Sequence, residues 1–227
     1  MTSRRAFVKN IGLGLAATSF AQYFQFVEAR SYRFKLCLNP GAIGVSLSNN
    51  ELLAAAIQYQ FQVIVPNVYA FNEMSEQAVN DYMDQMDEHE ISWGAIGLPV
   101  EFRQSEQKFE SDLRQLTEIL PLIKAMGMTR MSTWIMPCHD DLSYNQNMAL
   151  HAARLRKAAS ALDRYNVRLG LEYVGPKTLK ESKRHPFVSN MQEAKELISV
   201  IGASNVGVQL DAFHWYCAGE SKKDLLS

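Results

Sequence analysis

Apolar residues along the chain alternate between two patterns. Short runs rich in β-branched and aromatic residues are followed by longer segments in which apolar positions recur every three or four residues. Six short runs read as strands: Phe34–Asn39, Gln62–Pro66, Ser92–Leu98, Arg130–Ile135, Arg168–Val174 and Val206–Asp211. This regular alternation predicts consecutive βα units on a parallel sheet.

Capping residues predict where the intervening helices begin and end. The predicted starts are Ser48 with Glu51, Ser75, and Ser189 with Gln192, and the predicted stops are Gly127 and Gly202. No Gly-x-Gly-x-x-Gly phosphate loop follows any predicted strand. The units therefore favour an α/β barrel over a doubly wound sheet, and reactive residues are expected at the C-terminal ends of the strands.

Composition and charge narrow the class of protein. With 47% hydrophobic and 21% charged residues among 227, the chain can bury a globular core. A net charge of −1, with scattered lysines and arginines, argues against nucleic-acid binding. The cysteines, Cys37, Cys138 and Cys217, are too widely spaced to predict a disulfide framework or a zinc site.

The first 29 residues predict a separate export segment. Residues 3–9, Ser-Arg-Arg-Ala-Phe-Val-Lys, resemble a twin-arginine signal. The apolar stretch that follows is too short to span the roughly 30 Å of a bilayer core, so no stable membrane anchor is expected. We predict cleavage after Ala29, a barrel domain over 30–227, and passage through the twin-arginine translocase to the periplasm. The alternative is an ordinary amphipathic helix.

A carboxylate stands near the end of the fifth predicted strand. This strand reads Arg-Leu-Gly-Leu-Glu-Tyr-Val, so Glu172 interrupts an apolar run. A buried carboxylate must pair with a cation, bind a metal or take up a proton. From the sequence, Glu172 has two possible roles: it binds a metal, or it forms a structural ion pair with Arg130 or Arg168.

The sixth predicted strand ends in a second carboxylate, Asp211, and His214 follows three residues later. Because the C-terminal ends of neighbouring strands meet at one mouth of a barrel, we expect these residues near Glu172. Carboxylates with an imidazole suit Mn²⁺, Mg²⁺, Co²⁺ or Zn²⁺. Asp211 as a simple cap of the following loop is the alternative.

The segments Leu-Glu-Tyr-Val and Leu-Asp-Ala-Phe-His-Trp resemble the sugar phosphate isomerase/epimerase family, which has the xylose isomerase-like (β/α)8 TIM barrel fold. The resemblance covers nearly all of the chain after the export segment. It implies that Glu172 and Asp211 are metal ligands, that Glu172 is also a catalytic acid or base, and that His214 contacts substrate.

Three further residues are implied as substrate contacts by the same resemblance. Asn39 ends the first predicted strand and begins the loop after it, and Trp134 and His139 lie where the fourth strand ends. Asn39 as the start of a turn and His139 as a solvated loop residue are equally open.

The resemblance implies a metal-dependent isomerase or epimerase that acts on a small carbohydrate substrate, namely a sugar, sugar phosphate or related polyol, through an enediolate. In this family, a histidine and a second glutamate from strands seven and eight complete the metal site. Only about six βα units precede Ser227, so we expect a barrel truncated at its C-terminus, with the metal weakly bound or absent and catalysis impaired.

Two other functions are open from the sequence. The first is a non-catalytic remnant or a carbohydrate-binding module of the same fold. The second is the apurinic endonuclease branch of the fold, which needs a histidine-rich trinuclear site and a basic groove. Five histidines and the slight negative charge argue against the endonuclease.

Overall fold

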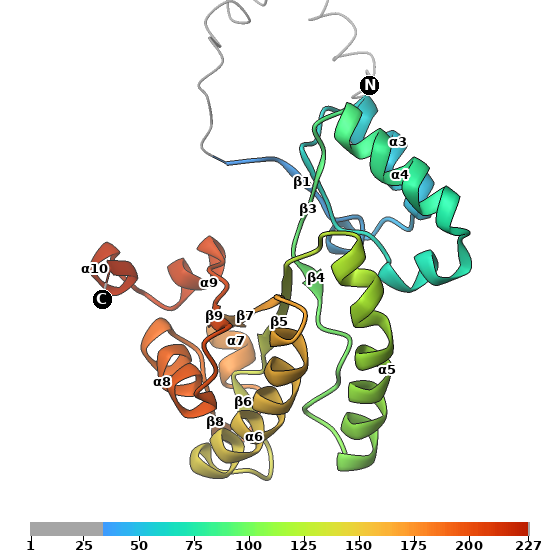
Figure 1. Cartoon of the computed structure of the whole chain (residues 1–227). Coiled ribbons are helices and arrows are strands. Elements are labelled where there is room, and N and C mark those ends of the chain that lie inside the picture. Colours follow the sequence, from blue (N-terminus) through green and yellow to red (C-terminus); the bar gives the residue numbers. More distant parts are fainter. Residues whose placement is uncertain (1–33, 227) are drawn as a thin grey trace, which may run out of the picture. The chain divides into compact units, whose positions relative to one another are not determined.

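Parallel pairing joins most strands in the order of the sequence. The structure is a computed structural model that describes residues 34–226. Its strands are β1 (Cys37–Leu38), β2 (Val63–Ile64), β3 (Ser92–Trp93), β4 (Ile96–Gly97), β5 (Arg130–Ile135), β6 (Cys138–His139), β7 (Arg168–Tyr173), β8 (His185–Pro186) and β9 (Val206–Val208). One parallel sheet has the order β1-β2-β3 and another β4-β5-β7-β9, while β6 and β8 form an antiparallel pair. All six predicted strand regions are thus confirmed as parallel strands (Figure 1).

The third predicted strand is wrong as a single element. Its first part, β3, pairs with β2, and its second part, β4, pairs with β5. Gly94 lies between them, where an added Cβ would be only 2.9 Å from a methyl group of Val65. This close approach to the residue that follows β2 accompanies the change of partner.

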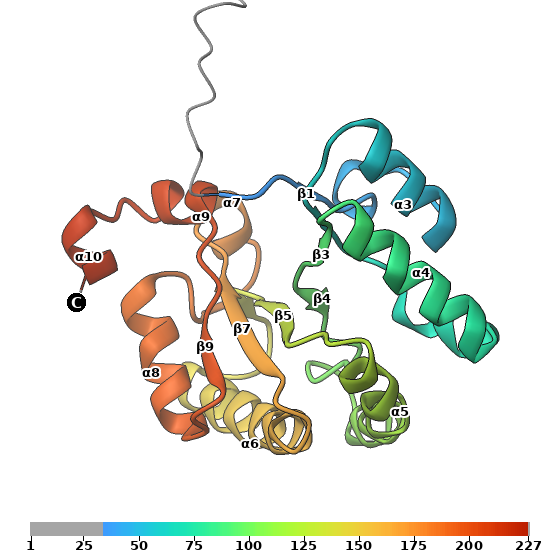
Figure 2. The ribbon, with the colours of Figure 1, turned by 45° about the horizontal axis from the view of Figure 1, so that its top comes forward.

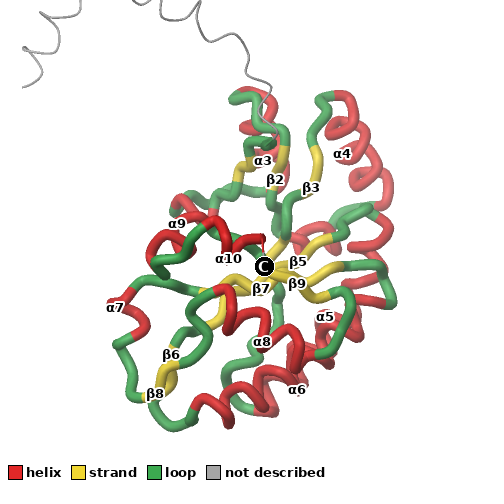
Figure 3. Tube along the Cα trace, turned by 90° about the vertical axis from the view of Figure 1, so that its left-hand side faces the viewer, coloured by secondary structure: helices red, strands yellow, loops and turns green. Residues whose placement is uncertain are grey.

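Helices follow the strands as the sequence predicts. They are α3 (Asn49–Gln58), α4 (Glu76–Glu88), α5 (Glu106–Ala125), α6 (Tyr144–Asp163), α7 (Lys177–Lys180), α8 (Met191–Ile201), α9 (Ala212–Cys217) and α10 (Lys222–Leu226), with 3₁₀ turns η1 (Gly41–Ile43) and η2 (Val68–Glu73). Figures 1 and 2 show α5, α6 and α8 along the same side of the β4-β5-β7-β9 sheet, and Figure 3 shows these elements from another direction. None of the described helices is both long and apolar enough to cross a bilayer.

Most of the predicted helix ends are confirmed. Ser48 forms a capping box with Glu51, Ser75 caps α4, and left-handed Gly202 ends α8. The capping box at Ser189 and Gln192 is wrong by one residue. Asn190 is the N-cap of α8, and its side chain accepts the backbone N–H of Glu193, whose carboxylate accepts the N–H of Ser189.

Alternation along the central strands gives the sheet two different faces. In β7, the side chains of Leu169, Leu171 and Tyr173 are buried. The residues between them point to the opposite face, which we call the inner face. The inner face of β5 and β7 carries Arg130, Ser132 and Trp134 opposite Arg168, Gly170 and Glu172, respectively. The predicted export segment, residues 1–29, lies outside the described residues.

Candidate metal centre

Glu172 lies on the inner face near the C-terminal end of β7. Its carboxylate accepts a hydrogen bond of 3.4 Å from the side-chain amide of Gln209. In the described part of the chain, no ion pair joins Glu172 to Arg130 or Arg168, which lie opposite each other at the start of their strands. The structural ion pair considered from the sequence is therefore not formed here.

Asp211 caps the short helix α9. Its Oδ1 accepts the backbone N–H groups of Phe213 at 2.6 Å and His214 at 3.2 Å. The capping role considered from the sequence is therefore present, and β9 ends at Val208, before Asp211 is reached. The cap also fixes His214 in the first turn of α9. The cap uses Oδ1 of Asp211, so the other oxygen of the carboxylate can bind a cation while the cap is formed.

Glu172 near the C-terminal end of β7 comes together with Asp211 and His214, which follow β9. One potential ligand atom from each lies within 4.8 Å of the other two, and all three residues are half-buried. The Nδ1 atom of His214 is buried and has no hydrogen-bond partner among the described residues. Two carboxylates with an unsatisfied imidazole nitrogen fit a divalent cation. We call these three residues the carboxylate–histidine group.

Gly175 allows α9 to approach the end of β7 closely. An added Cβ at Gly175 would lie 2.2 Å from the carbonyl oxygen of His214 and 2.9 Å from the backbone nitrogen of Ala218. Both are backbone atoms, which cannot move aside as a flexible side chain can. Gly175 was not identified from the sequence. The one feature that could have drawn attention to it is its position shortly after the strand that carries Glu172.

Glu220 connects the segment after α9 to the rest of the site. Its carboxylate accepts hydrogen bonds from the phenol of Tyr173 and from the backbone N–H of Met191, at the start of α8. Burial, followed by the interaction with Glu220, raises the pKa of Tyr173 well above its ordinary value. The phenol therefore stays protonated as a donor, and the contact ties this segment to β7 and α8.

Trp134 lies directly opposite Glu172 in the register of β5 and β7. The residue is 41% exposed. The guanidinium of Arg103 lies 4.8 Å from its ring centroid and donates a hydrogen bond to its carbonyl oxygen, while Glu101 pairs with Arg103 at 3.3 Å. An oriented aromatic ring is thus available beside Glu172. Neither Arg103 nor Gln209 was identified from the sequence. Gln209 had one signal: it precedes Asp211 by two residues, and residues two apart in a strand lie on the same face.

Asn39 and His139 are not joined to the carboxylate–histidine group by any hydrogen bond in the described part of the chain. The carbonyl of Asn39 accepts the N–H of Ala42 and so starts a turn. The Nδ1 atom of His139 accepts the backbone N–H groups of Asp141 and Leu142. Both residues therefore organise their own loops.

Consecutive parallel βα units with acidic side chains near the C-terminal ends of the strands define an α/β barrel protein whose candidate site lies at the carboxyl end of the strands. A family profile described as a xylose isomerase-like TIM barrel matches residues 23–226. The chain belongs to this family. The comparison with curated proteins gives no match.

Solved structures share this fold. A xylose isomerase domain protein from Alicyclobacillus acidocaldarius is 27% identical with a TM-score of 0.72, over 84% of this chain and 68% of that one. The IolI protein with a bound zinc atom is 17% identical with a TM-score of 0.66, over 85% and 68%. D-psicose 3-epimerase from Clostridium cellulolyticum, with D-tagatose, is 12% identical with a TM-score of 0.57, over 74% and 60%. The chain thus spans 60–68% of the length of these structures.

Proposed function

We propose that this protein is a metal-dependent isomerase or epimerase of a sugar, sugar phosphate or related polyol, with the weak metal binding and impaired catalysis expected from the sequence. The observation that carries the proposal is the carboxylate–histidine group, in which the three potential ligand atoms lie within 4.8 Å of one another. The zinc atom in IolI and the sugar in the D-psicose 3-epimerase structure are consistent with the proposal.

Each residue of the site has a role in the proposed reaction. Glu172 and Asp211 would hold the divalent cation with His214 beside them, and the cation would polarise the carbonyl and adjacent hydroxyl of a ketose. Glu172 moves a proton at the carbon next to that carbonyl, and the amide of Gln209 orients its carboxylate. The exposed ring of Trp134 packs against the apolar face of the sugar.

Deuterium exchange tests this function. Protein supplied with excess Mn²⁺ is incubated in D₂O with a panel of ketoses that includes D-tagatose. We expect NMR to show slow incorporation of deuterium at the carbon next to the carbonyl of at least one sugar, in keeping with the impaired catalysis expected from the sequence. Glu172→Gln should abolish this exchange. It should also weaken Mn²⁺ binding by about tenfold or more, because even loss of an outer-shell partner typically costs that much.

Glu88→Gln is the matched control, since Glu88 is an exposed residue at the end of α4. This variant should bind Mn²⁺ and exchange deuterium as the wild type does. Sugar binding without exchange would contradict the isomerase and favour a carbohydrate-binding module. Unchanged Mn²⁺ binding in Glu172→Gln would refute the proposed ligand set.

We also propose export to the periplasm through the twin-arginine translocase, on the basis of Arg4 and Arg5 in the N-terminal sequence. Replacing both arginines with lysine should retain the protein in the cytoplasm, because the paired arginines are the feature that the translocase reads. Fractionation of cells that express a tagged form measures the distribution. A double variant that still reaches the periplasm would disprove this route.

A further inference from the structure

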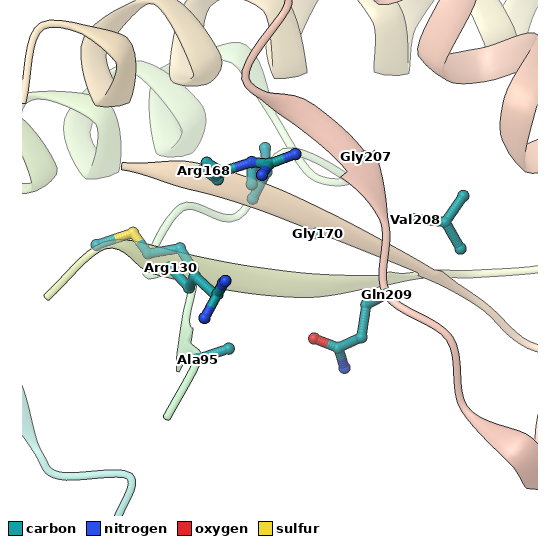
Figure 4. Close-up of a pocket in the computed structure, with 9 residues that line it drawn as sticks. Ala95, Arg130, Arg168, Gly170, Gly207, Val208 and Gln209 are labelled. Carbon is teal, nitrogen blue, oxygen red and sulfur yellow. The ribbon is translucent and has the colours of Figure 1, made fainter. Parts of the chain in front are cut away.

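A hollow of about 310 Å³ opens on the inner face of the sheet (Figure 4). Arg130 and Arg168, the first residues of β5 and β7, both line it, and Gln209 contributes a side-chain amide from the segment after β9. Glu172 lies four residues after Arg168, about 13 Å further along a regular strand. The two arginines therefore lie towards the end of the sheet away from Glu172, whereas Gln209 lines the hollow and also contacts Glu172.

The two arginines place like charges next to each other. Arg130 is the register partner of Arg168 in the parallel pair of β5 and β7, and both side chains belong to the inner face. Like charges directly opposite on neighbouring strands repel and destabilise the pair. Among the described residues, neither guanidinium has a carboxylate partner, and no acidic residue lines the hollow.

Gly207 leaves open space on the side of the hollow that it lines, whereas Gln209 packs close to Gly170, where an added Cβ would lie 3.1 Å from the Cβ of Gln209. Gly170 and Gly207 line the hollow, and an added Cβ at Gly207 would have no atom within 4 Å. The amide of Gln209 adds a polar group that can donate a hydrogen bond. The space is thus bordered by two cationic forks and one neutral donor.

We propose that Arg130 and Arg168, with Gln209, bind the oxyanion of a phosphate or carboxylate group. A guanidinium presents N–H donors in a planar fork that matches two oxygens of such a group, and an anion between the two forks removes their mutual repulsion. This site shares Gln209 with the proposed active site, since the Gln209 amide also donates a hydrogen bond to Glu172. Arg130 and Arg168 take no part in the proposed isomerase chemistry, so binding of the anion does not depend on that activity.

Calorimetric titration with inorganic phosphate tests the site. The protein and buffer are freed of metal on a chelating resin, so that phosphate cannot bind through a cation, and ionic strength is kept low. We expect saturable binding that Arg130→Gln and Arg168→Gln each weaken by about tenfold or more, the scale of losing a hydrogen bond to a charged group. Arg184→Gln, at an exposed arginine in the loop after α7, should bind as the wild type does.

A second variant tests the space independently of the charge. Gly207→Val should narrow the hollow and weaken phosphate binding, while circular dichroism reports that the protein is folded. A parallel titration with glycerol phosphate distinguishes a site for the free anion from a site for a phosphate ester, and saturable binding of either supports the proposal. Absence of saturable binding of either anion, or equal binding by wild type and both arginine variants, would overturn it.

Discussion

Replacing Gly175 with alanine is expected to disrupt the carboxylate–histidine group. The new Cβ would lie 2.2 Å from the carbonyl oxygen of His214 and 2.9 Å from the nitrogen of Ala218, so α9 must move away from β7. Overpacking usually costs 1–3 kcal/mol, and a clash with backbone atoms belongs at the upper end of that range, about 3 kcal/mol. Urea unfolding should show this loss, and Mn²⁺ titration should show weaker binding because His214 and Asp211 both belong to the displaced segment.

Gly97→Ala is the matched control for this experiment. Gly97 is also a glycine of the central parallel sheet, but an added Cβ there meets no atom within 4 Å. This variant should keep both the stability and the Mn²⁺ affinity of the wild type. If Gly175→Ala kept the stability and Mn²⁺ affinity of the wild type, as Gly97→Ala should, the inference that α9 packs closely on the end of β7 would be refuted.

The positions of Glu172, Asp211 and His214 could be predicted because they follow from topology. Parallel βα units bring the C-terminal ends of neighbouring strands together, so residues far apart in the sequence reach one mouth once the strands are identified. The strands themselves were identified from alternation and β-branched runs. The order and direction of the six strand regions therefore required no knowledge of tertiary contacts.

Close approaches could not be predicted in the same way. Gly94 and Gly175 matter because atoms of residues far away in the sequence lie within 3 Å of an added Cβ, and the sequence alone does not show which atoms those are. Arg103 is likewise placed over Trp134 by a loop, without any periodic pattern. Such residues become recognisable only from the folded chain.

Two predicted element ends are wrong because one residue type suits two structural roles, or because two neighbouring residues suit the same role. Asp211 extends an apolar run in the sequence, which favours a strand, but its carboxylate also suits an N-cap. In the structure Asp211 is the N-cap of α9, and β9 ends at Val208. At the start of α8, Ser189 and Asn190 are both good caps. In the structure Asn190 is the N-cap, because its side chain accepts the N–H of Glu193, and the carboxylate of Glu193 accepts the N–H of Ser189.

His151 is a buried titratable group that lies away from the proposed chemistry. It is only 3% exposed, and its Nδ1 lies 3.0 Å from the carbonyl oxygen of Asn147. The rings of Phe102 and Phe187 lie 5.3 Å and 4.9 Å from its own ring. Its Nε2 has no hydrogen-bond partner among the described residues. A positive charge at this position would therefore be poorly solvated.

Burial is the main cause that lowers the pKa of His151, from 6.5 to about 4. The hydrogen bond to Asn147 opposes this effect, and the nearby charges of Arg103, His139 and Arg154 reinforce it. Below pH 6.5 the unfolded chain takes up a proton at this residue, whereas the folded chain does so only near pH 4. The contribution of neutral His151 to stability is thus present above pH 6.5 and is lost as the pH falls towards 4.

We expect the free energy of unfolding to fall by up to about 3 kcal/mol from this residue alone as the pH decreases from 6.5 to 4. Urea unfolding at a series of pH values measures the slope. Carboxylates also contribute to acid destabilisation, so the decisive comparison is with His151→Leu, which cannot take up the proton and should show a slope smaller by this amount. His89→Leu, at an exposed position after α4, should keep the wild-type slope. An equal slope in wild type and His151→Leu would show that this imidazole is not buried in its neutral form, since its protonation would then be the same in the folded and unfolded chains.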